Sequence, residues 1–144
     1  MNPAPPIPAR VNLRTPDVMS HVQAQVENHY RSSLVETIRA QGGVLRSGQT
    51  TIRLAKQFGF CYGVERAIDL AYAAGKVFAD RRIFLLGEII HNPDVNAQMQ
   101  ALGIEFLPAR PSETDLDRLT PDAVVIVPAF GAETATVAAV KERG

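Results

Sequence analysis

The feature that most constrains the fold is a regular alternation of short apolar runs with amphipathic segments, which occupies the chain from residue 51 onward. The runs are typical of strands, which we expect at 51–56, 82–86, 104–107 and 123–127. The amphipathic segments have the period of helices, which we expect at 63–78, 93–102 and 132–143. Strands that are joined through helices run parallel, and the helices cover both faces of their sheet. The sequence therefore predicts an α/β fold, a parallel sheet flanked by helices.

Local signals support these boundaries. Asn92 is a helix N-cap residue, Pro93 suits the first helical position, and Gly103 suits the end of the same helix. The polar stretch 108–122 is expected to be a loop that holds one helical turn at 113–119. The 93–102 segment is therefore the best-marked helix of the α/β pattern.

The first 50 residues follow a different pattern. Ser20 and Gln23 have the spacing of a capping box, and apolar residues recur every four positions from Val22 to Ile38. Gly42 and the glycine after it are a stop signal, so we expect one long helix that packs on the outside of the domain. The predicted organisation is a disordered proline-rich arm at 1–19, an N-terminal helix and linker at 20–50, and an α/β lobe at 51–144.

Composition excludes several classes of protein. Lys+Arg and Asp+Glu both number 15, so no net charge attracts nucleic acid or an anionic membrane. No apolar run approaches the roughly 20 residues that span a bilayer, and the start of the chain has no secretory signal. The single cysteine cannot form an internal disulfide, which favours a reducing compartment. We therefore expect a cytoplasmic protein that binds neither nucleic acid nor membrane.

Three turns between expected strands and helices have unusual content, and they contain Cys61, His91 and Gly131. In a parallel sheet the turns after the strands lie at one edge, so we expect these three residues to face one crevice. A thiol at a helix start is favoured as thiolate, and helix N-termini bind phosphate. A protonated histidine adds a charged contact to an anion. The sequence therefore predicts an anion site beside a thiolate.

Each residue also has a simpler interpretation. A single cysteine is more often buried and inert than reactive, and a single histidine is more often a capping or packing residue than a ligand. His21 and His29 fall on the first helix, and we assign them no role.

Two alternative functions remain open. In a cysteine-dependent phosphatase, Cys61 and Arg66 would flank a phosphate loop, although four residues separate them where the familiar loop has five. In a non-enzymatic phosphate-binding α/β module, Cys61 would be inert. No G-x-G-x-x-G or Walker pattern follows any expected strand, which disfavours the second alternative.

Taken together, the three turns resemble the N-terminal third of the LytB-type iron–sulfur enzymes, the 4-hydroxy-3-methylbut-2-enyl diphosphate reductases. The resemblance runs from about residue 51 to the end and rests on the segments 58–67 (FGFCYGVERA), 88–96 (EIIHNPDVN) and 124–132 (VVIVPAFGA). The first segment resembles the one that carries the family's first cluster cysteine. The second resembles its first diphosphate-binding histidine segment, and the third resembles the branch found in plants and cyanobacteria.

The resemblance implies a [4Fe-4S] cluster held by three cysteines, one from each of three similar α/β lobes, of which this chain is the first. Cys61 would be one metal ligand, and His91 would bind the substrate diphosphate. The implied reaction is the reductive removal of the substrate's hydroxyl group, which gives isopentenyl and dimethylallyl diphosphates in the non-mevalonate isoprenoid pathway. The implied electron donor is ferredoxin or flavodoxin.

The same resemblance limits what this chain is expected to do. The family's proton-delivering glutamate and its other two cysteines are expected beyond residue 144, so we assign no catalytic residue within the chain. Gly144 has the character of a helix C-cap, and we expect an N-terminal fragment that is inactive as a reductase by itself. Phe130 stands where many bacterial members carry a second histidine, and we assign it no role in phosphate binding.

Overall fold

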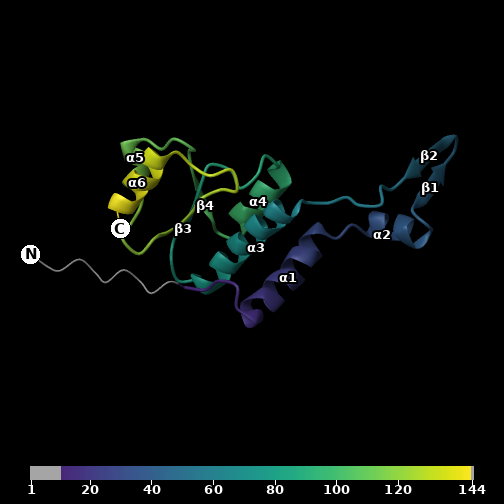
Figure 1. Ribbon diagram of the computed structural model, residues 1–144, viewed down its shortest axis with the longest axis horizontal. Helices are drawn as coiled ribbons and strands as arrows, with labels where there is room; N and C mark the ends of the chain where they lie inside the picture. The colour runs from purple at the N-terminus through teal and green to yellow at the C-terminus, as the bar shows by residue number, and fades with distance from the viewer. Residues whose placement is uncertain (1–10, 144) are drawn as a thin grey trace, which may run out of the picture.

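The computed structural model describes residues 11–143 (Figure 1). Its elements, in chain order, are α1 (Pro16–Tyr30), α2 (Ser33–Ala40), β1 (Val44–Ser47), β2 (Thr50–Arg53), α3 (Tyr62–Val77), β3 (Ile83–Leu86), α4 (Pro93–Ala101), β4 (Glu105–Leu107), α5 (Glu113–Leu116), β5 (Val124–Ile126) and α6 (Thr134–Glu142). The helices and strands predicted after residue 62 are confirmed. Their boundaries differ by at most two residues, except that α5 ends at Leu116, three residues before the predicted end of the helical turn at 113–119.

The central sheet has the strand order β4-β3-β5, and both pairings are parallel. The middle strand, β3, is buried along its whole length because a strand between two parallel neighbours is covered on both faces. Phe84 pairs with Glu105 of β4 on one side and with Val125 of β5 on the other. The α/β fold with a parallel sheet is therefore confirmed.

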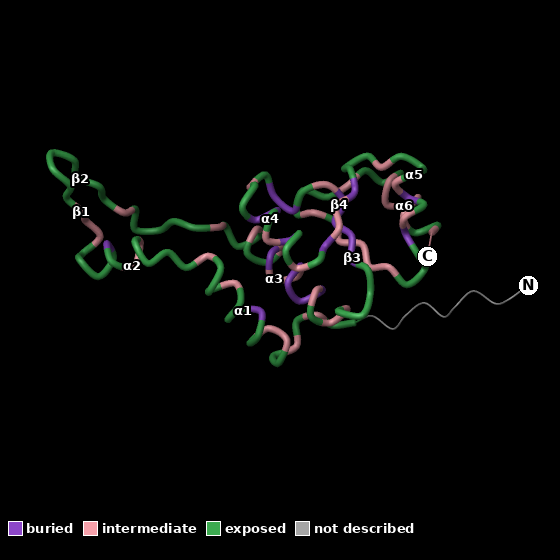
Figure 2. Tube along the Cα trace, turned by 180° about the vertical axis from the view of Figure 1, so that it is seen from behind, coloured by how far each residue is buried: buried purple, intermediate pink, exposed green. Residues whose placement is uncertain are grey.

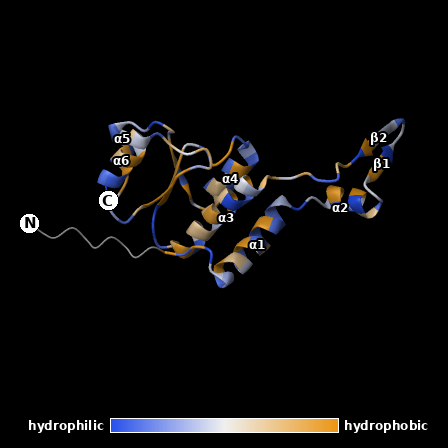
Figure 3. Cartoon of the chain, in the orientation of Figure 1, coloured by the Kyte–Doolittle hydropathy of each residue, from blue (hydrophilic) through white to orange (hydrophobic). Residues whose placement is uncertain are grey.

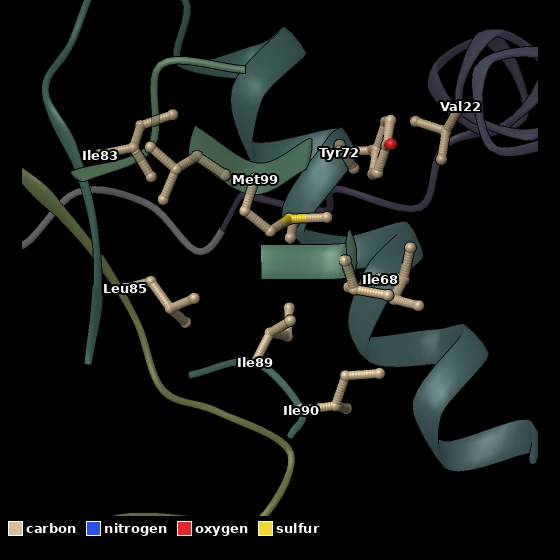
Figure 4. Close-up of a cluster of buried hydrophobic side chains, with 12 residues drawn as sticks. Val22, Ile68, Tyr72, Ile83, Leu85, Ile89, Ile90 and Met99 are labelled. Carbon is tan, nitrogen blue, oxygen red and sulfur yellow. The ribbon is translucent and has the colours of Figure 1, made fainter. Parts of the chain in front are cut away.

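Alternate residues of β3 belong to two separate apolar clusters. Ile83 and Leu85 pack with residues of α1, α3 and α4, among them Ile68 and Met99 (Figure 4). Phe84 and Leu86 belong to the second cluster, which contains Leu116 of α5 and is packed against by residues of α6. Helices thus cover both faces of the sheet, and the buried stretches lie along β3 and the helices beside it (Figure 2).

The N-terminal helix begins earlier than predicted. Pro16 occupies its first turn, and Thr15 is its N-cap residue. Ser20 lies inside the helix, where its hydroxyl donates to the carbonyl of Asp17 at 2.9 Å, so the predicted capping box at Ser20 is wrong. Of the arm predicted at 1–19, residues 1–10 lie outside the described residues, and the part from Pro16 onward is helical.

The prediction of one long helix is also wrong, because α1 ends at Tyr30 and α2 begins at Ser33. Ser32 is extended and caps α2, since its hydroxyl accepts a hydrogen bond from the N–H of Val35 at 3.3 Å. The four-residue spacing of apolar residues continues through this break, but Leu34 is 60% exposed and does not contribute to a common stripe. A serine N-cap therefore overrides the periodicity.

The strand predicted at 51–56 is not part of the parallel sheet. Strand β2 pairs antiparallel with β1 as a hairpin, and all four of its residues are exposed. Together with α2, the hairpin extends away from the rest of the chain (Figures 1 and 2). Its residues are mixed in hydropathy (Figure 3), and Ile52 is 45% exposed, so the segment has too little apolar surface for a buried central strand. A two-residue turn that begins with Gly48 joins the strands instead.

Among residues 11–143, no helix is both long enough and apolar enough to cross a membrane.

Candidate functional site

The turn after β3 is shaped by one glycine and two buried isoleucines. Gly87 has a φ of +77°, which a glycine adopts without strain, and its N–H donates to the carbonyl of Leu107 in β4 at 2.8 Å. Ile89 and Ile90 are 1% and 7% exposed and point into the first apolar cluster (Figure 4). Anchored in this way, the turn leaves Glu88 exposed at the surface.

Two asparagines fix the other end of this turn. Asn92 caps α4, as predicted, because its side-chain oxygen accepts hydrogen bonds from the N–H groups of Asp94 and Val95 at 3.0 and 3.2 Å. Asn96 is buried, and its amide donates to the carbonyl of Ile90 at 3.0 Å. The sequence pattern did not single out Asn96, although this asparagine belongs to the same nine-residue motif. The two asparagines thereby fix the segment before α4, in which His91 directly precedes the N-cap residue.

His91 contacts two further side chains. Its Nδ1 lies 2.8 Å from Oε2 of Glu88, and its ring stacks on Phe130 with centroids 4.9 Å apart and planes 16° apart. Phe130 belongs to the turn after β5, so the stacking joins two of the three predicted turns. The sequence analysis assigned no role to Glu88. The one feature that could have indicated this contact is the i, i+3 spacing of an acid and a histidine in one short turn.

A cavity of about 540 Å³ lies at the carboxyl edge of the sheet and is lined by residues that follow β3, β4 and β5. His91 and Gly131 line it together, as predicted. It also contains Arg110 and Glu133, which the sequence analysis missed, and Nε of Arg110 donates to Oε1 of Glu133 at 2.7 Å. The cavity therefore combines a histidine and a guanidinium, two groups that bind phosphate oxygens in proteins.

Cys61 occupies a different place from the one predicted. It is exposed and is the N-cap residue of α3, but it is not among the residues that line the cavity. The prediction of a common crevice for Cys61, His91 and Gly131 required a parallel strand before Cys61, and β2 does not supply one. The neighbouring Phe60 is held by packing instead, because its ring meets that of Tyr30 edge-on at 5.3 Å.

The surroundings of Cys61 bear on the chemistry available to it. Arg14 and Arg66 lie beside the hydroxyl of Tyr62 and lower its pKa. No group of three or more His, Cys, Asp or Glu side chains within residues 11–143 is arranged to hold a metal ion. Cys61 thus fits a metal cluster as a single ligand only, and the remaining ligands would have to come from outside the described part of the chain.

His29, to which we assigned no role from the sequence, connects helices of the domain. Its Nδ1 contacts the hydroxyl of Tyr72, which in turn donates to Gln98 of α4 at 3.3 Å. Burial raises the pKa of both Tyr72 and Tyr30, and the neighbouring Tyr72 raises that of Tyr30 further. These hydrogen-bonded side chains connect α1 to α3 and α4, which lie on the face of the sheet opposite α6.

Known proteins share these segments. The family model of the LytB protein matches residues 52–144. A protein of Thermosynechococcus vestitus named 4-hydroxy-3-methylbut-2-enyl diphosphate reductase is 45% identical over 123 residues, which are 85% of this chain and 31% of the relative. Proteins with the same name from Gloeobacter violaceus and Synechococcus sp. RCC307 are 45% and 41% identical, over 80% and 94% of this chain and 28% and 33% of the relatives.

No solved structure is significantly similar to the chain. The chain spans about 31% of the length of the curated relatives that it matches first. The family match covers α3, the parallel sheet and the turns after its strands, and these turns line the cavity. On these grounds the chain belongs to the LytB family.

Proposed function

We propose that this chain provides the diphosphate-binding part, and one cluster cysteine, of a 4-hydroxy-3-methylbut-2-enyl diphosphate reductase. The observation that carries the proposal is the cavity in which His91 and the Gly131 turn meet at the carboxyl edge of a parallel sheet. The names of the relatives supply the substrate and the type of reaction, the reduction of 4-hydroxy-3-methylbut-2-enyl diphosphate. The products, isopentenyl and dimethylallyl diphosphates, are those that the resemblance of the three turns implies.

The residues of the cavity suit an anionic ligand. His91 precedes the N-terminus of α4, where the helix dipole attracts negative charge. Arg110 offers a second cation, although Glu133 is bound to it and would have to share it with a ligand. Phe130 donates no hydrogen bond, in keeping with the absence of a phosphate role, and supports the His91 ring instead.

In this proposal Cys61 is one thiolate ligand of a [4Fe-4S] cluster, and the other ligands come from two further α/β lobes that resemble this one. When bound, the cluster would supply electrons to the substrate, received from ferredoxin or flavodoxin in the cytoplasm. The exposure of Cys61, the N-cap residue of α3, supports a role as ligand, because its sulfur is accessible. The predicted boundaries at residues 20 and 51, which separate the arm, the N-terminal helix with its linker, and the α/β lobe, remain part of this proposal.

No observation favours the two alternatives. A phosphatase would need Arg66 to face a phosphate held at Cys61, whereas Arg66 lies beside Tyr62. The absence of p-nitrophenyl phosphate hydrolysis would agree with the reductase assignment, and a rate abolished in Cys61→Ser would overturn it. A binding module with an inert thiol predicts that alkylation of Cys61 leaves ligand affinity unchanged and that iron never binds.

Calorimetric titration of the chain with inorganic diphosphate tests the central assignment. His91→Gln should weaken binding by about 1.5–3 kcal/mol, the scale of a hydrogen bond to a charged group. His21→Gln is the matched control, because His21 lies exposed on α1 and far along the chain from the cavity residues. Equal affinities of wild type and His91→Gln would refute the proposed role of His91.

Anaerobic reconstitution with iron and sulfide tests the role of Cys61. The 144-residue chain should neither retain a stable cluster nor turn over substrate, because a single thiolate does not hold a cubane cluster. A stable visible absorption band together with reductase turnover would contradict this expectation. In a protein that carries all three lobes, Cys61→Ser should lower the iron content and abolish turnover.

A further inference from the structure

The contact between Glu88 and His91 determines where the imidazole proton lies. Oε2 of Glu88 lies 2.8 Å from Nδ1 of His91, within the range of a charge-assisted hydrogen bond. An ionised carboxylate can only accept, so Nδ1 must carry the hydrogen. In a neutral ring the other nitrogen, Nε2, then carries a lone pair.

Phe130 keeps the ring in this orientation. The planes of the two rings are nearly parallel, 16° apart, so a partial rotation of the imidazole would break the stacking, and a half-turn flip would break the bond to Glu88. His91 is largely exposed, with 81% of its side chain accessible, and no described residue bonds to its Nε2. The Nε2 edge is therefore the one that a ligand meets in the cavity.

A neutral ring in this state is a poor partner for an anion, because a lone pair faces the phosphate oxygens. Only the doubly protonated ring offers an N–H donor and a positive charge at Nε2. We propose that Glu88 is a positioning residue that holds His91 with its hydrogen on Nδ1, so that binding of a diphosphate at Nε2 is coupled to the uptake of a proton by the ring. This inference rests on the proposed function, since it takes the ligand of His91 to be a diphosphate.

Other charged groups face the same cavity and enter the pH dependence. Arg110 and Glu133 come from the turns after β4 and β5 and form an ion pair with each other. Asp94 lies in the first turn of α4. None of these three bonds to the His91 ring, which distinguishes them from Glu88.

The test is calorimetric titration of the full 144-residue chain with inorganic diphosphate in two buffers of different ionisation enthalpy, at about pH 8, where an ordinary imidazole is neutral. The difference between the buffers gives the number of protons taken up. In Glu88→Gln the amide can donate to Nδ1, which moves the hydrogen of the neutral ring to Nε2. Proton uptake on diphosphate binding should therefore be lower in Glu88→Gln than in the wild type. The ratio of the diphosphate affinity at about pH 6.5 to that at about pH 8 should be roughly two- to five-fold smaller in the variant, the scale of an exposed charged pair.

Glu133→Gln is the matched control, because it removes the same charge from the cavity without touching the imidazole. It should bind diphosphate more tightly and take up as many protons as the wild type. An equal loss of proton uptake in Glu88→Gln and Glu133→Gln would overturn the proposal, because the loss would then follow from the lower negative charge of the cavity and not from the bond to His91. Unchanged uptake in Glu88→Gln would overturn it as well.

Nitrogen-15 NMR of the histidine rings provides a second measurement that needs no ligand. In the wild type at about pH 8 the singly protonated form of the His91 ring should carry its hydrogen on Nδ1, contrary to the usual preference of a free histidine side chain for Nε2, and in Glu88→Gln it should carry it on Nε2. His91→Gln assigns the signal among those of His21 and His29. A wild-type ring protonated at Nε2 would overturn the inference. If instead His91→Gln left diphosphate affinity unchanged, the proposed function itself would fail, whatever the tautomer.

Discussion

Replacement of Gly87 by alanine should destabilise the protein for two separable reasons. The first is backbone conformation, because the φ of +77° costs an L-residue about 1–2 kcal/mol, partly offset by about 0.4–1 kcal/mol from a less flexible unfolded chain. The second is contact, because a Cβ at this position would lie 3.3 Å from Cβ and 3.5 Å from Cα of Ala109. Ala109 is on an exposed loop that can yield, so the contact should add about 1 kcal/mol, the low end for overpacking.

Gly103→Ala separates the two contributions. Gly103 has a φ of +81°, but nothing lies within 4 Å of the position where its Cβ would be. Equilibrium unfolding in urea should therefore give a loss of about 1 kcal/mol for Gly103→Ala and about 2 kcal/mol for Gly87→Ala. A double-mutant cycle of Gly87→Ala with Ala109→Gly should recover the difference as a coupling energy.

The double-mutant cycle can also refute the proposed contact between positions 87 and 109. Equal losses in the two alanine variants, with no coupling between positions 87 and 109, would show that the close approach of the two turns has no energetic consequence. Since Gly87 precedes Glu88 and His91, its replacement should also weaken diphosphate binding, whereas Gly103→Ala should leave the affinity unchanged. A loss of affinity in Gly103→Ala would mean that stability, and not the position of the turn, controls binding.

Three further predictions concern the support of the site and the sheet. Asn96→Ala should lower the free energy of unfolding by about 1–2 kcal/mol, because it removes the buried bond to the Ile90 carbonyl, as measured by urea titration. Met99→Ala should cost about 2–4 kcal/mol, because Met99 is fully buried, while the exposed Gln100→Ala should have little effect in the same assay. Two arginines hold the pKa of Glu105 below its usual value, so its contribution to stability is present at neutral pH and is lost as the pH falls through the range of carboxyl titration. The stability difference between wild type and Glu105→Gln should therefore narrow between about pH 6 and pH 3 in acid-unfolding experiments.

The sequence predicted the parallel sheet well because each of its elements is locally unambiguous. The run Ile83–Leu86 is apolar throughout, which only a strand covered on both faces satisfies. The start of α4 was equally clear, since Asn92 and Pro93 both act within one turn of the helix. In such segments the physical cause of the structure lies within a few residues, and a single sequence contains it.

The predictions that were wrong concern segments in which two local sequence patterns compete, or in which the structure depends on a partner far away in the chain. Ser32 interrupts a continuous apolar periodicity, and the sequence offers no means to rank a serine cap against that periodicity. Strand β2 has a plausible strand composition, but its pairing with β1 and not with the sheet depends on which partner is available. Strand pairing is non-local, so composition alone left the topology before Cys61 undetermined.

The same distinction separates the two halves of the proposed site. Within one short motif lie the glycine, isoleucines and asparagines that position His91, and the cavity beside it is complete within residues 86–133. Cys61 has no such local support, because it caps an exposed helix end and belongs to no group of three or more metal-ligating side chains in the described part of the chain. In the proposed function, Cys61 shares one cluster with cysteines of other lobes, and the packing of those lobes would set its position. Diphosphate binding should therefore be measurable in this chain, whereas cluster binding should require the additional length that its relatives have.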